Sequence, residues 1–561
     1  MHSRTPALRN QMVFPTLVRE RVEKGPHVAR FFLYLVKELQ LNLYRISWYG
    51  TPPYCRYTLL ACIFYAMYHG HFESRQIIRF TGDSIGAQWI LNGMKMPSYK
   101  TVERTITDLL NETENFFIQI LRLCDNYGLI GRERTFTDGT KKQANASKHK
   151  AMSYEYLNKK IDNSKETLKL LFAELRSIMD DFEDMTDEEF ESLIMEDAIE
   201  THAEFRKSHK QDLVEKQNQI FNMDSEEKTT GTNKDTVTER LKDKLVSVQN
   251  IEPESQDKAV DMLNDIAFVS KRVDRMIDAR TTLENKWKKE HGNAKIPGEK
   301  QINFTDPDSA IMQTKHHGIQ QCYNHLAIID DRANIILGTY TCNSSSDQLG
   351  LIPTIENTER TFGSLEGIVL GADAGFFSAS NISYTMKKGI DFYASYPESK
   401  SPYAKDKFVY NEQIDVYICP KGNILSVQGQ PNNEVKHRYC NEEACRSCTV
   451  SKDCTKAKDG IRRIERDMVD DKLREDAKEK AQSKMGRSIL KQRKSIPEPV
   501  WGNMKTQDSF TQMHFRGIEK ASCEFNLRCA FQNIRKLLKV YLKSRSFQDV
   551  VHSSELYQDS A

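Results

Sequence analysis

The chain has 561 residues, 39% of them hydrophobic, which is enough apolar material for a large buried core and, by length, for roughly three or four structural units. Its 81 basic and 79 acidic side chains leave a formal charge of +2, so any attraction to nucleic acid must come from local clusters of charge. The longest apolar run, around Leu59 to Met67, is far shorter than the roughly 20 residues of a membrane-spanning helix, and residues 1–15 lack an apolar signal segment, which excludes a membrane protein and predicts a cytoplasmic one.

Apolar residues recur at helical spacing from about Val28 to Asn126, and this pattern predicts an all-helical N-terminal domain. Within it, Ser74–Phe80 and Ser98–Leu110 are expected to be short helices separated by a turn, with basic residues on their polar sides. This arrangement suits a helix-turn-helix-like DNA contact, although a solvated helical face explains the spacing equally well.

The pattern changes to strand-like alternation at Arg134–Asp138, which predicts a strand that ends at the aspartate. Residues from about Ser153 to Gly292 are highly charged and helix-patterned, so we expect an inserted helical arm, partly coiled coil, with a flexible middle. Strand patterns then return among helix-like stretches, which predicts an α/β sheet domain. These later strands are expected at Tyr323–Ile329, Asn334–Tyr340, Gly367–Ala372 and Ile390–Ser395.

The end of the chain reads as a cysteine-rich loop, a basic helical stretch from Arg462 to Lys494, and an amphipathic helix from Ile518 to Leu542. The cysteines follow the spacing Cys440-x4-Cys445-x2-Cys448-x5-Cys454, with Cys419 upstream after an alternating strand. A CxxC pair with further thiols nearby is a good pattern for a tetrahedral zinc site, and a zinc-free loop of reduced thiols is the alternative.

Three carboxylates are candidates for chemistry. Asp138 and Asp373 each follow an apolar strand pattern, at the kind of position where ligands of open α/β sheets gather, although Asp-Gly after a strand is also a common turn. Glu498 is the only acidic residue between Lys484 and Lys505, and read alone it would be a surface glutamate. Because it lies between two prolines, we expect it at the start of a helix.

Several motifs carry a resemblance that covers about Phe14 to Leu538, apart from the charged arm. They are Asp138-Gly139-Thr140-Lys141 followed by Ala144-Asn145-Ala146, then Ala372-Asp373-Ala374-Gly375-Phe376, Glu498 with Lys505, and Phe515-Arg516-Gly517-Ile518-Glu519-Lys520 followed by Glu524, Leu527 and Gln532-Asn533-Ile534. With these motifs in this order, the chain resembles the DDE transposases of bacterial insertion sequences, in the branch with a helical N-terminal domain and a Cys-rich insertion.

The resemblance implies a ribonuclease H-like core in which Asp138, Asp373 and Glu498 hold two Mg²⁺ (or Mn²⁺) ions for phosphodiester cleavage and strand transfer. It also favours Cys419, Cys445, Cys448 and Cys454 as ligands of a structural Zn²⁺, with Cys440 as the substitute. For contacts with DNA, the resemblance and the basic segment around Glu498 together favour Lys141, Arg487, Lys491, Arg493, Lys494, Lys505 and Arg516, each of which could instead be a solvated cation.

The expected fold is α/β with large all-α parts: a mixed-sheet core with a helical N-terminal domain, a helical arm insertion and a small Cys-rich insertion. The expected segments are 1–128 (helical, DNA-binding), 129–152 (first part of the core), 153–300 (helical insertion), 301–415 (core), 416–460 (Cys-rich zinc-binding insertion), 461–545 (C-terminal helices completing the core) and 546–561 (flexible tail).

The expected function is a nucleoid-associated transposase that acts, as a homodimer on DNA, on double-stranded element ends and target DNA. Three alternatives remain open: a ribonuclease H-like nuclease without strand transfer, an inactive DNA-binding relative, and a zinc-dependent DNA-binding regulator.

Overall fold

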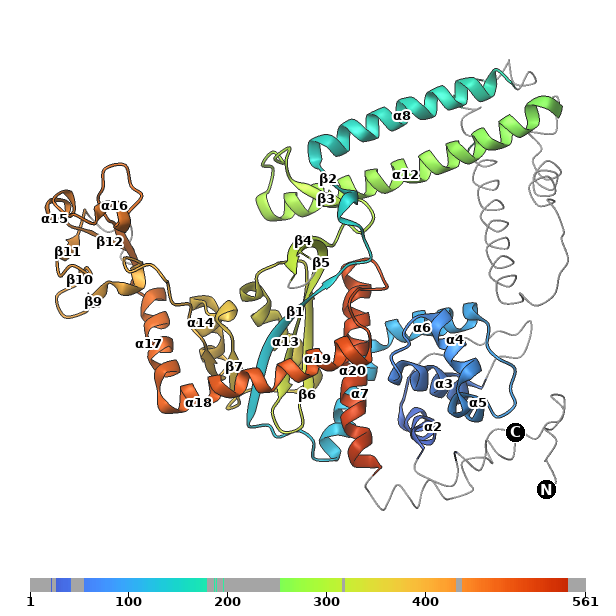
Figure 1. Cartoon of the computed structure of the whole chain (residues 1–561), viewed down its shortest axis with the longest axis horizontal. Coiled ribbons are helices and arrows are strands. Elements are labelled where there is room, and N and C mark those ends of the chain that lie inside the picture. The colour runs from blue at the N-terminus through green and yellow to red at the C-terminus, as the bar shows by residue number, and fades with distance from the viewer. Residues whose placement is uncertain are drawn as a thin grey trace, which may run out of the picture. The chain divides into compact units, whose positions relative to one another are not determined.

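The computed structural model describes residues 27–41, 55–178, 253–314, 318–429 and 436–542, and the single residues Val22, Thr186, Glu188 and Met195 (Figure 1). The chain divides into two compact units, Met1–Asn145 with Ser309–Ala561, and Ala146–Asp308. The described residues form a mixed α/β structure, as predicted. The tail expected at 546–561 and the middle of the charged arm lie outside the described residues.

The N-terminal part of the first unit is helical. Its helices are α2 (Val28–Glu38), α3 (Arg56–Tyr68), α4 (Ser74–Asp83), α5 (Ile85–Leu91), α6 (Tyr99–Asn111) and α7 (Thr113–Asn126). The expectation of two helices separated by a turn is wrong, because α5 lies between α4 and α6. Ser84 allows this: it ends α4, and its side chain caps α5 by accepting a hydrogen bond from the backbone N–H of Ala87.

A mixed sheet forms the centre of the same unit. Its strands are β1 (Arg134–Gln143), β4 (Ala310–Thr314), β5 (Gly318–Asp330), β6 (Ile335–Cys342), β7 (Val369–Ala372) and β8 (Asp391–Ala394). The order is β4-β5-β1-β7-β8, with β6 also paired to β5. β1 runs antiparallel to β5 and parallel to β7, and β7 runs parallel to β8. The carboxyl ends of β1, β7 and β8 therefore lie at the same edge of the sheet.

The expectation that the first strand ends at Asp138 is wrong. β1 pairs with β5 without interruption from Thr135 to Gln143, and Gly139 has no positive φ, so Asp138-Gly139 makes no turn. Pairing with the other neighbour, β7, stops at Phe136. Asp138 therefore lies in the middle of a strand but just beyond the point where β7 has ended, which leaves one side of the backbone open there.

Helices cover this sheet. They are α13 (Leu351–Phe362), α14 (Ala379–Lys387), α17 (Asp470–Gln482), α18 (Lys484–Gln492), α19 (Pro497–Gln507) and α20 (Ile518–Tyr541). On α20, Asn533 fastens the helix to β6, since its side chain accepts from the N–H of Ile336 at 2.9 Å and donates to the carbonyl of Ile336 at 2.8 Å. Phe531 of the same helix packs edge-on against Phe64 of α3, which joins the helical N-terminal part to the sheet.

The helical stretch predicted at Arg462–Lys494 begins instead with a strand, β13 (Ile464–Asp467), and breaks at Ser483. The strand forms because β13 pairs with another strand in a second, antiparallel sheet. The strands of this sheet are β9 (Val409–Asn411), β10 (Val416–Ile418), β11 (Ile424–Val427), β12 (Lys436–Cys440) and β13, with the short helices α15 (Glu442–Arg446) and α16 (Ser451–Cys454) beside them.

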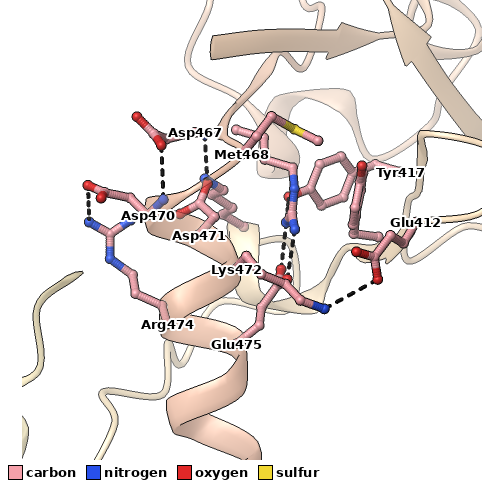
Figure 2. Close-up of polar contacts among 12 residues, drawn as sticks. Glu412, Tyr417, Asp467, Met468, Asp470, Asp471, Lys472, Arg474 and Glu475 are labelled. Atoms are coloured by element: carbon pink, nitrogen blue, oxygen red, sulfur yellow. Dashed lines mark hydrogen bonds and ion pairs between the residues drawn. The ribbon is translucent and has the colours of Figure 1, made fainter. Parts of the chain in front are cut away.

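Polar contacts join this second sheet to α17 (Figure 2). Arg466 of β13 is 2% exposed, binds Glu475 of α17 through both Nη atoms and donates to the Tyr417 hydroxyl. Burial works against the charge of Arg466, but Glu475 and Tyr417 raise its pKa above the ordinary value. Beside it, Lys472 pairs with Glu412. These contacts fix the start of α17 on the Cys-rich region.

The second unit contains two long helices, α8 (Tyr154–Arg176) and α12 (Pro253–His291), and a small sheet of β2 (Ala151–Ser153) and β3 (Gln301–Asn303). The helices pack antiparallel along two apolar clusters, one that contains Leu175 and Leu263 and one that contains Ile161 and Met276. None of the described helices is long and apolar enough to cross a membrane.

Candidate active site

The carboxylates of Asp138 and Asp373 both face one positively charged side chain, Arg493. Asp373 directly follows β7, as predicted, and Asp138 projects from the neighbouring β1. The guanidinium of Arg493, just after α18, lies with Nη1 3.7 Å from Oδ1 of Asp138 and 3.7 Å from Oδ2 of Asp373. The side chains of Arg493 and Asp138 are only 16% and 20% exposed, so this charge pairing is partly shielded from water. Two carboxylates at one sheet edge thus share one positive charge.

Asp138 is further held by α19. Trp501 donates its indole N–H to Oδ2 of Asp138 at 3.1 Å. Burial raises the pKa of Asp138 above its ordinary value, and the nearby Asp373 raises it further, while Arg493 and the indole hydrogen bond act in the opposite direction. The site therefore favours bound positive charge over two free carboxylates.

Asp373 is oriented by its own backbone. Its Oδ1 accepts a hydrogen bond from the N–H of Gly375 at 2.8 Å, at the start of the short 3-10 helix Ala374–Phe376. This fixes the carboxylate and turns Oδ2 toward Arg493.

Glu498 lies in the first turn of α19, so its predicted place at a helix start is confirmed. Its side chain is exposed, and the structure gives it no contact with Asp138 or Asp373. Trp501, which binds Asp138, follows it by three residues and therefore lies on a neighbouring part of the same helical face. The structure brings Asp138 and Asp373 together and leaves Glu498 at the rim.

Two site residues were missed from the sequence. Trp501 could have been found by its spacing from Glu498. Asp347, at the start of the 3-10 helix Asp347–Gly350, lies close enough to Asp373 for the two charges to repel, and it accepts a 2.6 Å hydrogen bond from Asn324 of β5. Only the contact between β5 and the loop after β6 reveals it, because Ser346-Asp347 reads in sequence as an ordinary loop before a helix.

The predicted DNA-contacting residues differ in exposure. Arg493 is largely enclosed by the two aspartates, whereas Arg487, Lys491, Lys494 and Lys505 are exposed. Lys141 is half-buried on β1, and Arg516 is exposed and donates from Nε to the carbonyl of Asn145 at 2.9 Å.

A groove lies beside part of this basic segment. Its volume is about 840 Å³, and its lining includes Arg487 and Lys491 of α18 and Ser395 and Tyr396, which follow β8. Because β7 and β8 are parallel, the groove opens at the same sheet edge as Asp373.

Four cysteines line one small cavity of about 30 Å³: Cys419, Cys445, Cys448 and Cys454. Burial raises the pKa of Cys454, and the other three thiols are close enough to raise it further. Cys440 is buried at the end of β12 and is not part of this lining. Among the described residues, no three histidine, cysteine or acidic side chains lie close enough together to hold a metal ion. The thiols thus share a cavity without being at metal-bonding positions.

Residues 418–538 match a protein-family model described as a transposase DDE domain. The match covers about a fifth of the chain and includes Glu498 and the four cysteines of the small cavity, but neither Asp138 nor Asp373. No curated protein and no solved structure matches the chain. The resemblance to DDE-class transposases is confirmed by this match.

Proposed function

We propose that the chain is a DDE transposase that binds the terminal inverted repeats of its insertion sequence, as a homodimer on DNA, and catalyses metal-dependent strand cleavage and transfer. The observation that carries this proposal is that adjacent strands place Asp138 and Asp373 on either side of the Arg493 guanidinium, in a chain that matches a transposase DDE domain. The mixed sheet, with one catalytic candidate on its central strand and the other after the parallel neighbour, supports the ribonuclease H-like core that the resemblance implies.

The donor chemistry of this pair fits Mg²⁺ or Mn²⁺, because both are hard cations that prefer carboxylate oxygens. Arg493 shows that positive charge is stabilised between the two aspartates. Glu498 is the proposed third ligand, from the rim. A bound divalent cation would stabilise the negative charge that develops on the attacking and leaving oxygens of a phosphodiester. Trp501 keeps the Asp138 carboxylate in place. A cation bound between the two carboxylates would displace Arg493, which would then be available to pair with the phosphate.

Two purified-protein assays test this proposal: nicking of DNA that carries the element ends, and joining of those ends to a second duplex, both in Mg²⁺. Cleavage followed by joining supports a transposase. Cleavage without joining would favour a nuclease of similar architecture, and specific binding without cleavage would favour an inactive DNA-binding relative.

DNA is proposed to follow the basic residues around α18 and α19. Changing Arg487 and Lys491 together to Gln should flatten the dependence of log K on log [salt] by roughly 2, because each lost phosphate contact releases about one fewer counterion. Filter binding or fluorescence anisotropy at several salt concentrations measures the slope. Lys387→Gln with Lys388→Gln, at the C-terminal end of α14, is the matched control. An unchanged slope in the first variant would mean that these side chains merely face solvent.

Zinc is proposed to be held by Cys419, Cys445, Cys448 and Cys454, since they line one cavity that is large enough for about one small ion or water molecule. Four thiolates would saturate zinc, so its role would be structural. The protein purified without added zinc should contain about one zinc per chain. Cys445→Ser with Cys448→Ser should lose the metal and unfold locally, as measured by elemental analysis and hydrogen exchange. Cys440→Ser should keep it, and loss of zinc in that variant would make Cys440 the ligand.

A further inference from the structure

Asp373 has acidic neighbours on both faces of the sheet. Successive side chains of a strand point to opposite faces, so Asp138 and Gly139 of β1 face opposite sides. Arg493 and Trp501 contact Asp138 on one side. Asp347 and Asn324 lie beside Gly139 on the other. Asp373, which follows the end of β7, is close to both groups.

The space on the Asp347 side is kept open by two glycines. A Cβ atom added to Gly139 would lie 3.0 Å from Oδ1 of Asp347 and 3.4 Å from Oδ1 of Asn324. A Cβ atom added to Gly375 would lie 3.0 Å from Oδ1 of Asp373 and 3.4 Å from Oδ2 of Asp347. Oxygen atoms of three side chains therefore border the space above these two glycines.

One of these oxygens is buried and unsatisfied. Asn324 is 0% exposed, and its Nδ2 donates to Oδ1 of Asp347, which fixes the amide so that its Oδ1 is the free atom. That oxygen has no hydrogen-bond partner in the described structure. An unpartnered buried acceptor destabilises the fold because its lost hydrogen bonds to water are not replaced. An amide oxygen next to two carboxylates is a typical set of ligands for a hard divalent cation.

We propose that Asp347, Asn324 and Asp373 form a divalent-cation subsite on the face of the sheet opposite Asp138. Asp373 is then shared between two positions: one with Asp138, where Arg493 now lies, and one with Asp347 and Asn324. The inference deepens the proposed function by adding two residues to the carboxylate triad. A cation here would satisfy the Asn324 oxygen and offset the repulsion between Asp347 and Asp373. Lys141, opposite Asn324 in the β1–β5 register, borders the same subsite and could contact a phosphate drawn to it.

Mn²⁺ titrated into the full chain without DNA tests the subsite, with bound metal measured by electron paramagnetic resonance. Asp347→Asn and Asn324→Ala should each weaken Mn²⁺ binding at this subsite at least tenfold. Gly139→Ala, which removes no oxygen but fills the space, should also weaken it. Asp138→Asn should leave this Mn²⁺ bound. Glu366→Gln, an exposed acid before β7, is the matched control and should bind as the unaltered chain does.

Thermal unfolding separates a metal ligand from a structural brace. Without metal, Asp347→Asn should be as stable as the unaltered chain or more so, because it removes a like charge beside Asp373. With saturating Mn²⁺, its stabilisation by metal should be smaller. Mn²⁺ binding by Asp347→Asn equal to that of the unaltered chain overturns the subsite, as does an unaltered chain that binds no Mn²⁺. The proposed function fails by a different result, namely full DNA cleavage by Asp138→Asn, so the two failures are distinguishable.

Discussion

Asp138→Asn should abolish strand cleavage while leaving specific binding to the element ends nearly intact. The Asp138 carboxylate faces positive charge at the sheet edge, and in the proposed function it holds a metal ion and does not contact bases, so its loss should remove transition-state stabilisation and spare DNA recognition. A loss of roughly 4 kcal/mol of transition-state stabilisation corresponds to about a thousandfold in rate. Single-turnover nicking of labelled element ends in Mg²⁺ gives the rate, and a gel-shift titration gives the affinity.

The matched control is Asp391→Asn. Asp391 opens β8, at the opposite end of the parallel strands from Asp373, and pairs with Lys480 outside the site. This variant should cleave at about the rate of the unaltered chain. Asp138 would be excluded from the active site if its Asn variant nicked the ends at an undiminished rate.

The local sequence pattern was sufficient to predict the position of a residue where that position depends only on the residue's own strand or helix. Asp373 follows a short apolar strand whose end is marked by Asp373-Ala374-Gly375, and Glu498 opens a helix because proline is accepted there. The same reasoning was wrong at Asp138, since β5 supplies pairing partners well beyond the aspartate and prevents the turn that Asp-Gly often makes. The helix expected at Arg462–Lys494 begins with a strand for a similar reason: β12 provides an edge that the local charge pattern does not show.

Contacts between distant segments could not be predicted in this way. Arg493 was expected to bind DNA, but its place between two aspartates depends on the order of strands in the sheet and on the path of the chain after α18. Asp347 and Asn324 meet because the loop after β6 folds back on β5. Neither the hydrophobic periodicity nor a sequence motif predicts such a contact.

A buried ion pair stabilises the C-terminal helix, α20. Glu524 and Arg528 of α20 are 2% and 0% exposed and form a salt bridge of 2.9 Å. Arg528 lies between the rings of Phe72 and Phe510, at 4.0 and 4.2 Å, so no water can replace a lost partner. His514 adds a third contact, with Nδ1 2.7 Å from Oε1 of Glu524. This cluster joins the N-terminal helices to the segment before α20.

Glu524→Gln should therefore lower the free energy of unfolding by about 3 kcal/mol at pH 7, because it leaves the Arg528 charge buried and uncompensated. Burial alone would raise the pKa of Glu524, but Arg528 and His514 lower it from 4.5 to about 2. Stability from a lowered carboxylate pKa is fully present above the unfolded value near 4.5 and is lost as the pH falls through about 2. The loss of unfolding free energy in the variant should consequently be largest at neutral pH and shrink between pH 4.5 and pH 2.

Urea unfolding and hydrogen exchange of α20 at pH 7 and pH 3 measure this loss, with the exposed Glu519→Gln on the same helix as control. Replacing both partners, Glu524→Leu with Arg528→Met, should recover much of the loss. An equal deficit at both pH values would contradict the charge pairing as its cause.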